Sequence, residues 1–224
     1  TTVSLSRNVS TTAGTTYGDT LQFDVAVSPG GATGLVELRD GGISGPVIGI
    51  GTLTAGSVTI TPAANAVTAG THGNVVALYL GDSSYQSGAS SSLSPAQVVS
   101  AKNLTISGAA ANSKYADGTT AATLSGGSLS GVVTGDEASV TLNQTGGFAT
   151  ASAGTGIAVT GTCSLSGSKS TNYTVTQPTG LAADIHAAAI WTGASGNLWN
   201  TTGNWIDNLV PDGANVTADF TTLD

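Results

Sequence analysis

The chain has 224 residues, of which 39% are hydrophobic and only 8% are charged, and its formal net charge is −8. This negative charge disfavours nucleic acid and anionic lipid as partners, because both repel an acidic protein at long range. The apolar content is high enough for a folded core, and no apolar run approaches the roughly 20 residues of a membrane-spanning helix. The sequence opens with neither methionine nor a basic-then-apolar leader, so we expect an internal fragment of a longer chain.

The first hundred residues alternate apolar and polar side chains, which is the period of a β-strand. In residues 20–28, Leu21, Phe23, Val25 and Val27 share one face of the predicted strand. Similar runs lie at 1–6, 34–40, 46–53, 57–62, 74–80 and 91–99, separated by clusters of Gly, Pro, Asp and Ser. Seven short strands in a hundred residues predict an antiparallel sandwich.

Two stretches of this region, FDVAVSPGGATGLVELRDGG at 23–42 and AGTHGNVVALYLGDSSYQSGAS at 69–90, carry a family resemblance. Both are similar to segments of the bacterial immunoglobulin-like repeats of long surface proteins. The resemblance implies an Ig-like Greek-key sandwich over residues 1–99. It also implies a turn before a strand at His72, and a tight turn with ring packing formed by Tyr79, Gly81, Asp82 and Tyr85.

The alternation restarts at NLTISG, residues 103–108, without a flexible or charged linker. A short join restricts the angle between neighbouring domains. The segments SKYADGTTAATLSGGSLSGVVTGDEASVTL and SGSKSTNYTVTQPTGLAADIHA resemble the YDG-type repeat of large haemagglutinin-like bacterial proteins. This resemblance implies a second small β domain, a sandwich or a β-grasp-like fold, over residues 100–188.

The Tyr-Asp-Gly signature of that family is interrupted here, because Ala116 separates Tyr115 from Asp117. A one-residue displacement reverses the face of a sheet on which a side chain lies. We therefore expect Tyr115 to pack differently from its counterpart in the family.

Cys163 is the single cysteine, so no disulfide can form within the chain. It shares one predicted strand face with Ile157, Val159 and Leu165, which indicates a buried and unreactive thiol. A reactive thiol would need a neighbouring base or cation, and this stretch contains neither.

No catalytic residue and no cofactor is expected. The sequence lacks a dinucleotide or phosphate-loop signature, a His-Glu-x-x-His pair and a Gly-x-Ser-x-Gly elbow, and His186 stands alone. Calcium is the one metal ion left open, because aspartates lie in predicted turns where oxygen ligands could converge. These residues are Asp19, Asp82, Asp117, Asp136 and Asp212. The simpler interpretation is that each carboxylate bonds its own turn backbone.

All three tryptophans, Trp191, Trp199 and Trp205, lie within residues 190–205. The segment IWTGASGNLWNTTGNWIDNLVPDGANVTADF resembles the opening of bacterial autotransporter-type passenger repeats. The matching residues are Trp191, Gly193, Trp199, Asn204, Trp205, Pro211, Gly213 and Phe220. The resemblance implies the start of an incomplete β-solenoid over 189–224, closed by a plug of large rings. The alternative is that the three rings stack on sugars, which makes these tryptophans the candidate ligand-binding residues.

These patterns predict an all-β chain with tandem modules: an Ig-like Greek-key sandwich, a second small β domain and a short solenoid-like segment. The predicted function is a structural stalk or spacer of a large bacterial cell-surface or secreted adhesin, or part of an extracellular fibre. The alternative is a carbohydrate- or surface-binding module. The predicted partners are neighbouring β modules of the same long chain and, under the alternative, glycans or other host-surface ligands, without nucleic acid or membrane insertion. The predicted location is extracellular or at the bacterial cell surface.

Overall fold

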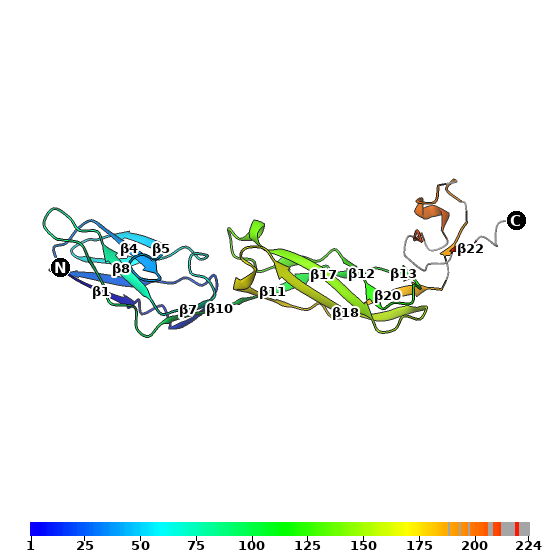
Figure 1. Ribbon diagram of the computed structural model, residues 1–224, viewed down its shortest axis with the longest axis horizontal. Helices are drawn as coiled ribbons and strands as arrows, with labels where there is room; N and C mark the ends of the chain where they lie inside the picture. Colours follow the sequence, from blue (N-terminus) through cyan, green and yellow to red (C-terminus); the bar gives the residue numbers. More distant parts are fainter. Residues whose placement is uncertain (188, 193, 197, 206–207, 212–217, 220–224) are drawn as a thin grey trace. The chain divides into compact units, whose positions relative to one another are not determined.

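The computed structural model describes residues 1–187, 189–192, 194–196, 198–205, 208–211 and 218–219. Within these ranges the secondary structure consists of β-strands and three short 310 helices (Figure 1), which confirms the predicted all-β class with tandem modules. The chain divides into two compact units. Unit 1 contains residues 1–103, 131–141 and 167–174, and unit 2 contains residues 104–130, 142–166 and 175–224.

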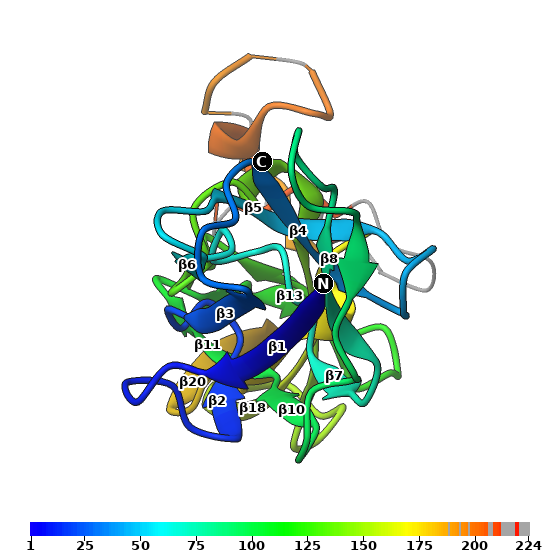
Figure 2. The same ribbon diagram turned by 90° about the vertical axis from the view of Figure 1, so that its left-hand side faces the viewer.

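Unit 1 is built mainly from the strands of the first hundred residues. These are β1 (Thr2–Arg7), β2 (Gly14–Thr16), β3 (Phe23–Ser28), β4 (Leu35–Asp40), β5 (Val47–Thr52), β6 (Ser57–Ile60), β7 (Gly70–His72), β8 (Val75–Tyr79), β9 (Gly88–Ala89) and β10 (Gln97–Ser100). They form three sheets in the orders β1-β3-β6, β5-β4-β8-β9 and β2-β10-β7. Figure 2 shows β4, β5 and β8 beside one another. Strands are present in all seven predicted runs, although the last one, β10, begins only at Gln97 and not at residue 91. The strands β2, β7 and β9 have only two or three residues and are too short to show an alternation.

The core of this region follows the alternation read from the sequence. Phe23, Val25 and Val27 on β3 are all buried, and Phe23 lies opposite Ile60 of β6. On β5, Gly49 leaves room for this packing, because a Cβ atom there would lie 2.7 Å from Ile60 Cγ2. The sheet β1-β3-β6 therefore packs closely against β5 because a glycine stands at that position.

Residues 102–186 contribute a second group of strands. These are β11 (Lys102–Ser107), β12 (Ala110–Ala111), β13 (Lys114–Tyr115), β14 (Ala121–Ala122), β15 (Leu124–Ser125), β16 (Ser128–Ser130), β17 (Thr141–Phe148), β18 (Gly154–Ser166), β19 (Tyr173–Thr176) and β20 (Leu181–His186). The largest sheet has the order β13-β20-β18-β17-β14, and the smaller ones are β16-β11-β19 and β12-β15. The 310 helices η1 (Glu137–Ser139) and η2 (Ser170–Asn172) belong to unit 1, although they lie within this part of the sequence.

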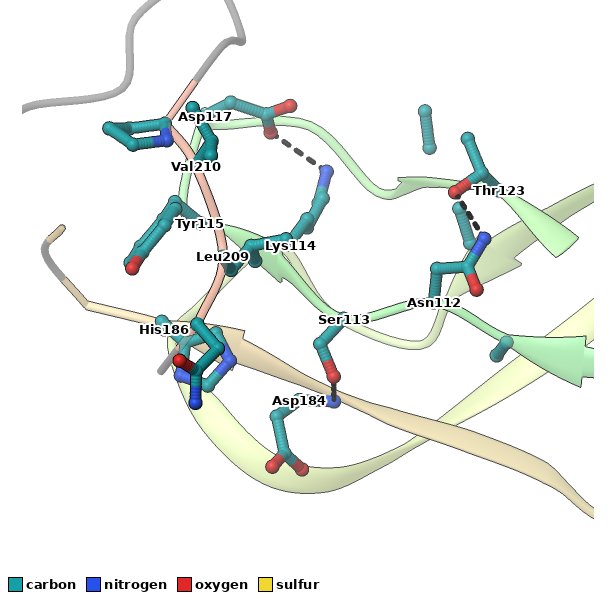
Figure 3. A pocket seen from close by; sticks show the side chains of 15 residues that line it. Asn112, Ser113, Lys114, Tyr115, Asp117, Thr123, Asp184, His186, Leu209 and Val210 are labelled. Carbon is teal, nitrogen blue, oxygen red and sulfur yellow. Dashed lines mark hydrogen bonds and ion pairs between the residues drawn. The ribbon is translucent and has the colours of Figure 1, made fainter. Parts of the chain in front are cut away.

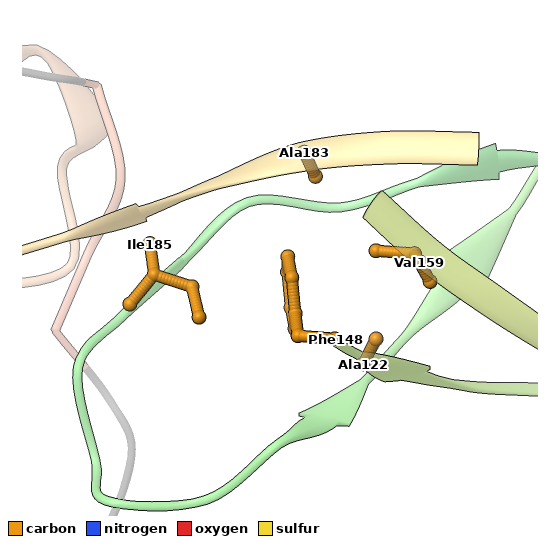
Figure 4. Close-up of a cluster of buried hydrophobic side chains, with 5 residues drawn as sticks. All are labelled: Ala122, Phe148, Val159, Ala183 and Ile185. Carbon is orange, nitrogen blue, oxygen red and sulfur yellow. The ribbon is translucent and has the colours of Figure 1, made fainter. Parts of the chain in front are cut away.

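The long strand β18 confirms the predicted position of the cysteine. Val159 and Cys163 are buried on one face, with Ile157 partly buried on the same side. Beside this face the ring of Phe148 lies among small and branched side chains (Figure 4). The members of this cluster are Ala122, Phe148, Val159, Ala183 and Ile185.

The described part of the C-terminal segment contains β21 (Ala189–Ile190), η3 (Thr202–Asn204) and β22 (Ala218–Asp219). β21 and β22 pair in parallel, and an isolated bridge joins Trp191 to Trp205. Several residues of the autotransporter-like pattern and one calcium candidate lie outside the described ranges, namely Gly193, Asp212, Gly213 and Phe220. The solenoid therefore stays a prediction. Across the described residues, no helix has the length and apolar character needed to cross a membrane.

Candidate functional site

The three tryptophans lie together but differ in exposure. Trp205 is 1% exposed, and its ring meets Trp191 and Trp199 edge-on at centroid distances of 5.0 and 4.7 Å. Its Nε1–H donates to the backbone oxygen of Trp199 over 3.0 Å. A ring that is buried and hydrogen-bonded in this way is a packing element, as a plug requires.

Trp199 has a different environment, because it is 47% exposed beside Leu198, which is 67% exposed. An exposed indole next to an exposed aliphatic side chain can contact the apolar face of a ligand. Trp191 is intermediate in exposure. The structure thus separates a buried member from an exposed member of the predicted set, and their role in binding stays a prediction.

A side-chain amide fixes the turn that carries these rings. Asn204 is fully buried; its Oδ1 accepts a hydrogen bond from the backbone N–H of Ser195 at 2.6 Å, and its Nδ2 donates to the oxygen of Leu198 at 3.0 Å. A buried amide with both ends bonded ties the segment before Trp199 to the segment before Trp205.

Tyr115 of the interrupted signature packs with these rings. It is 3% exposed and forms a buried cluster with Ala189 and Trp205. The backbone explains the position, because β13 pairs in parallel with β20 and brings Tyr115 opposite His186. The rings of Tyr115 and His186 lie 5.4 Å apart. Ala116 thus separates a buried tyrosine from a turn aspartate.

A cavity of about 1000 Å³ lies beside this cluster in unit 2. Its walls combine charged, amide, hydroxyl and apolar side chains from β12 to β14, β20 and residues 208–211. Figure 3 shows Asp117 beside Lys114 at one end of the view and Asp184 near Ser113 at the other. The residues lining it are Ala111, Asn112, Ser113, Lys114, Tyr115, Asp117, Ala121, Ala122, Thr123, Asp184, His186, Asn208, Leu209, Val210 and Pro211.

Asp117 and Lys114 form an ion pair on the cavity wall. Lys114 Nζ donates to Asp117 Oδ1 over 2.8 Å, and the same Nζ also donates to the backbone and hydroxyl oxygens of Thr119. Asp117 Oδ1 further accepts the backbone N–H and the hydroxyl of Thr119. The hydrogen bond from Lys114, followed by those from Thr119, lowers the pKa of the Asp117 carboxyl to about 2. The aspartate is therefore ionised at neutral pH, and the charge of Lys114 is locally balanced.

Asp184 contributes a second carboxylate to the cavity. Its Oδ1 accepts the backbone N–H of Gly156 over 2.6 Å, while its own backbone N–H donates to the hydroxyl of Ser113. The first bond holds the side chain against β18, and the second fixes the backbone of Asp184 beside the segment before β13. Sequence reasoning did not identify this cavity, because its walls come from three separated segments. The one available signal was the spacing of Asp184 and His186, two residues apart, which places both on one face of an extended segment.

A second polar cluster is buried in unit 1, around Asp136. The hydroxyls of Tyr17 and Tyr173 both donate to Asp136 Oδ2, over 2.7 and 2.8 Å, and Asn65 Nδ2 donates to Oδ1 over 3.2 Å. The Tyr173 hydroxyl also accepts the N–H of Val133. Asp136 and Tyr17 are both 0% exposed.

The ionisation of this cluster reflects burial and hydrogen bonding together. Burial is the largest influence on Asp136 and raises its pKa, but hydrogen bonds from Tyr17, Tyr173 and Asn65 outweigh it, so the pKa of Asp136 is lowered overall. Burial, together with the neighbouring Asp136 carboxylate, raises the pKa of Tyr173 to about 12. The same two causes raise the pKa of Tyr17 more strongly. The cluster is a buried carboxylate with two neutral tyrosines.

Asp136 corrects the prediction that the turn aspartates only bond their own backbone. Asp19 accepts the N–H of Thr16 in its own turn, and Asp82 accepts those of Ser84 and Tyr85 in its turn but also the N–H and the hydroxyl of the distant Thr33. The hydrogen bonds to the Asp136 side chain all come from residues distant in sequence, which the sequence pattern did not reveal. Within the described part of the chain, no three His, Cys, Asp or Glu side chains are grouped so as to hold a metal ion.

His72 lies at the end of β7 rather than in a turn. Its Nδ1 lies 2.6 Å from Asp40 Oδ2, and its Nε2 lies 2.8 Å from the backbone oxygen of Thr68. Both ring nitrogens thus contact oxygen atoms of unit 1, which fits the structural role that the resemblance implied.

The match to a family model lies in the second group of strands. Residues 100–180, less than half of the chain, match the family model described as the YDG domain. A solved structure described as "Biofilm associated protein - BSP domain" is similar to 83% of this chain at 14% identity and a TM-score of 0.26, a value too low to support an argument. This chain spans only 30% of that chain. A search of curated proteins gave no match. The chain is thus a β-rich protein in which residues 100–180 are similar to the YDG domain.

Proposed function

We propose that this chain is a structural spacer within a large bacterial surface or secreted adhesin, and that it holds other parts of the protein away from the cell. Its partners are neighbouring β modules of the same chain, and its role involves no catalytic step, nucleic acid or membrane insertion. The β-rich fold and the similarity of residues 100–180 to the YDG domain support this proposal.

The observation that carries the proposal is the Asp136 cluster. Tyr17 comes from the first hundred residues, whereas Asp136 and Tyr173 come from the part of the sequence that matches the YDG domain. All three lie in unit 1. Because a buried charged network is costly to break, these segments resist separation more than a plain surface contact would. A spacer under tension needs such a connection between its successive parts.

The path of the chain supports the same role. The chain passes between unit 1 and unit 2 five times, after residues 103, 130, 141, 166 and 174. A single flexible linker would allow the two units to move apart as a random coil. Under this proposal, the five connections share a load applied to the chain among several segments rather than placing it on one tether.

Replacing this segment tests the spacer role directly. In the bacterium, the 224 residues are exchanged for an unrelated pair of β-sandwich domains of equal total length, and surface exposure and adhesion are measured. A spacer predicts that antibodies label intact cells in both strains and that adhesion is retained. Loss of adhesion with surface display intact would contradict the spacer role.

The second candidate function is a carbohydrate- or surface-binding module, and the exposed ring of Trp199 favours it. Under this alternative, Trp199→Ala abolishes binding of the isolated chain to polysaccharide-coated surfaces. Trp199→Phe keeps an aromatic ring at this position and therefore retains part of the binding. Tyr85→Ala, in unit 1, is the control for a partly exposed ring elsewhere. Equal binding by all variants would exclude the tryptophan platform.

A further inference from the structure

The cavity beside Tyr115 has a feature that a purely structural pocket does not need. Asp117 and Asp184 each use one carboxylate oxygen, Oδ1, for every hydrogen bond that the structure gives their side chains. Among the described residues, none donates to Oδ2 of either side chain. Two carboxylates are therefore held in place by fixed donors, and each has an oxygen left to accept a hydrogen bond from another molecule.

From this arrangement we propose that the cavity is a binding site for a neutral saccharide, a site distinct from the tryptophan platform and a function beyond that of a spacer. The volume of about 1000 Å³ lies at the upper end of the roughly 300–1,000 Å³ of small-molecule sites. Sugar hydroxyls donate to carboxylate oxygens, and such charge-assisted hydrogen bonds are stronger than neutral ones. Asp117 and Asp184 are the acceptors.

The charges of the wall disfavour an anionic ligand and offer little to a cationic one. An anionic ligand meets two carboxylates, and the charge of Lys114 is already taken up by Asp117 and Thr119. Lys114 and Asp117 balance each other, so a cationic ligand would find only Asp184, a single partly exposed carboxylate, from which it gains little. A neutral molecule with many hydroxyl groups brings no charge to be desolvated and still donates to both carboxylates.

The rest of the wall suits a sugar ring as well. Leu209 and Val210 are partly buried and provide apolar contact for the C–H face of a ring. Thr123 and Asn208 are exposed on the wall and add a hydroxyl and an amide. This mixture of an apolar surface with a few fixed polar groups is typical of small-molecule sites.

Titration of the ¹⁵N-labelled full chain with cellotetraose, maltotetraose and chitotetraose tests the proposal by NMR. The backbone amides of Thr119 and Gly156 are the reporters, because they donate to Asp117 and Asp184. At least one of these probes is expected to shift both signals in a saturable way. Asp184→Asn, which keeps the size of the side chain, is expected to raise the Kd about tenfold, the effect of one charge-assisted hydrogen bond.

Asp19→Asn is the matched control, because Asp19 also accepts a backbone N–H but lies in unit 1; it should leave the Kd unchanged. Ala121→Trp fills the cavity without removing a hydrogen bond, and it should block binding even if Asp184→Asn fails to fold. A heparin tetrasaccharide and a chitosan tetramer serve as the anionic and cationic probes.

Each other outcome overturns the proposal. No shift of Thr119 and Gly156 with any neutral probe rules out the site. A response only to heparin or only to chitosan assigns the cavity to an ionic ligand. Shifts of the tryptophan indole N–H signals, with the cavity amides unmoved, assign binding to the tryptophans instead. A failure of the spacer role in the replacement experiment affects none of these readouts.

Discussion

Asp136 in unit 1 and Asp184 in unit 2 present the same functional group in opposite settings. Asp136 is fully buried and accepts hydrogen bonds on both oxygens, from Tyr17, Tyr173 and Asn65. Asp184 is partly exposed on a cavity wall and accepts on Oδ1. A buried carboxylate that accepts hydrogen bonds on both oxygens stabilises the fold. A carboxylate that is fixed through one oxygen can accept a hydrogen bond from a ligand on the other.

The largest expected effect tests this comparison by removing each carboxylate. Asp136→Ala leaves two buried tyrosine hydroxyls and Asn65 without their acceptor, so we expect the free energy of unfolding to fall by about 3–5 kcal/mol. Asp184→Ala exposes one amide that water can reach, and we expect a loss below about 1 kcal/mol. Urea unfolding measures both. Equal losses would mean that burial does not separate the two roles.

Within the unit 1 cluster, the two tyrosines are expected to be unequal. Tyr17→Phe removes one hydrogen bond, whereas Tyr173→Phe also leaves the N–H of Val133 without its acceptor. We expect a loss of about 1 kcal/mol for Tyr17→Phe and about 2 kcal/mol for Tyr173→Phe. Because both hydroxyls share one oxygen, the double variant should lose a different amount from the sum of the two, by at least about 0.5 kcal/mol. Strict additivity would contradict a shared network.

The pH dependence of stability should sharpen the same comparison. The pKa of Asp136 is lowered in the folded state, so its stabilisation is present above the unfolded pKa of roughly 3.9 and is lost as the pH falls below that value. The pKa of Tyr173, about 12, exceeds the unfolded value near 10, so its contribution is present below pH ~10 and is lost as the pH rises toward 12.

Thermal unfolding between pH 2 and 12 measures this dependence. The difference in melting temperature between the wild type and Asp136→Asn should shrink in acid, and tyrosinate absorbance should report Tyr17 and Tyr173 only as unit 1 unfolds. Ionisation of all tyrosines near pH 10 with the fold intact would show that the cluster is open to water.

A further pair of variants compares the exposed and the buried tryptophan of unit 2. Trp199→Ala loses one edge-on ring contact with Trp205, and we expect a cost below about 1.5 kcal/mol. Trp205→Ala, the buried comparison, removes a ring that is 1% exposed, and we expect about 3–5 kcal/mol from the cavity that it leaves. Intrinsic fluorescence follows both variants. A larger loss for Trp199 would reverse the assignment of plug and exposed ring.

The amino-acid sequence determined the local features of this protein. Alternation predicted the strand that carries Phe23, Val25 and Val27 and the buried face of β18 with Cys163, because the face of a side chain follows from its parity along an extended chain. Alternation cannot predict the buried face of a strand of two or three residues such as β13. Tyr115 on this strand is buried because β13 pairs in parallel with β20.

Only the tertiary structure decided which aspartates act together and where. Asp136 lies next to Gly135 and carries the same turn signal as Asp117, yet one is fully buried beneath two tyrosines and the other lies on a cavity wall. Tyr17 and Asp136 are 119 residues apart in sequence, and the cavity joins segments near 114, 184 and 209. Burial and hydrogen-bond saturation depend on such distant neighbours, and no local pattern of side chains encodes them.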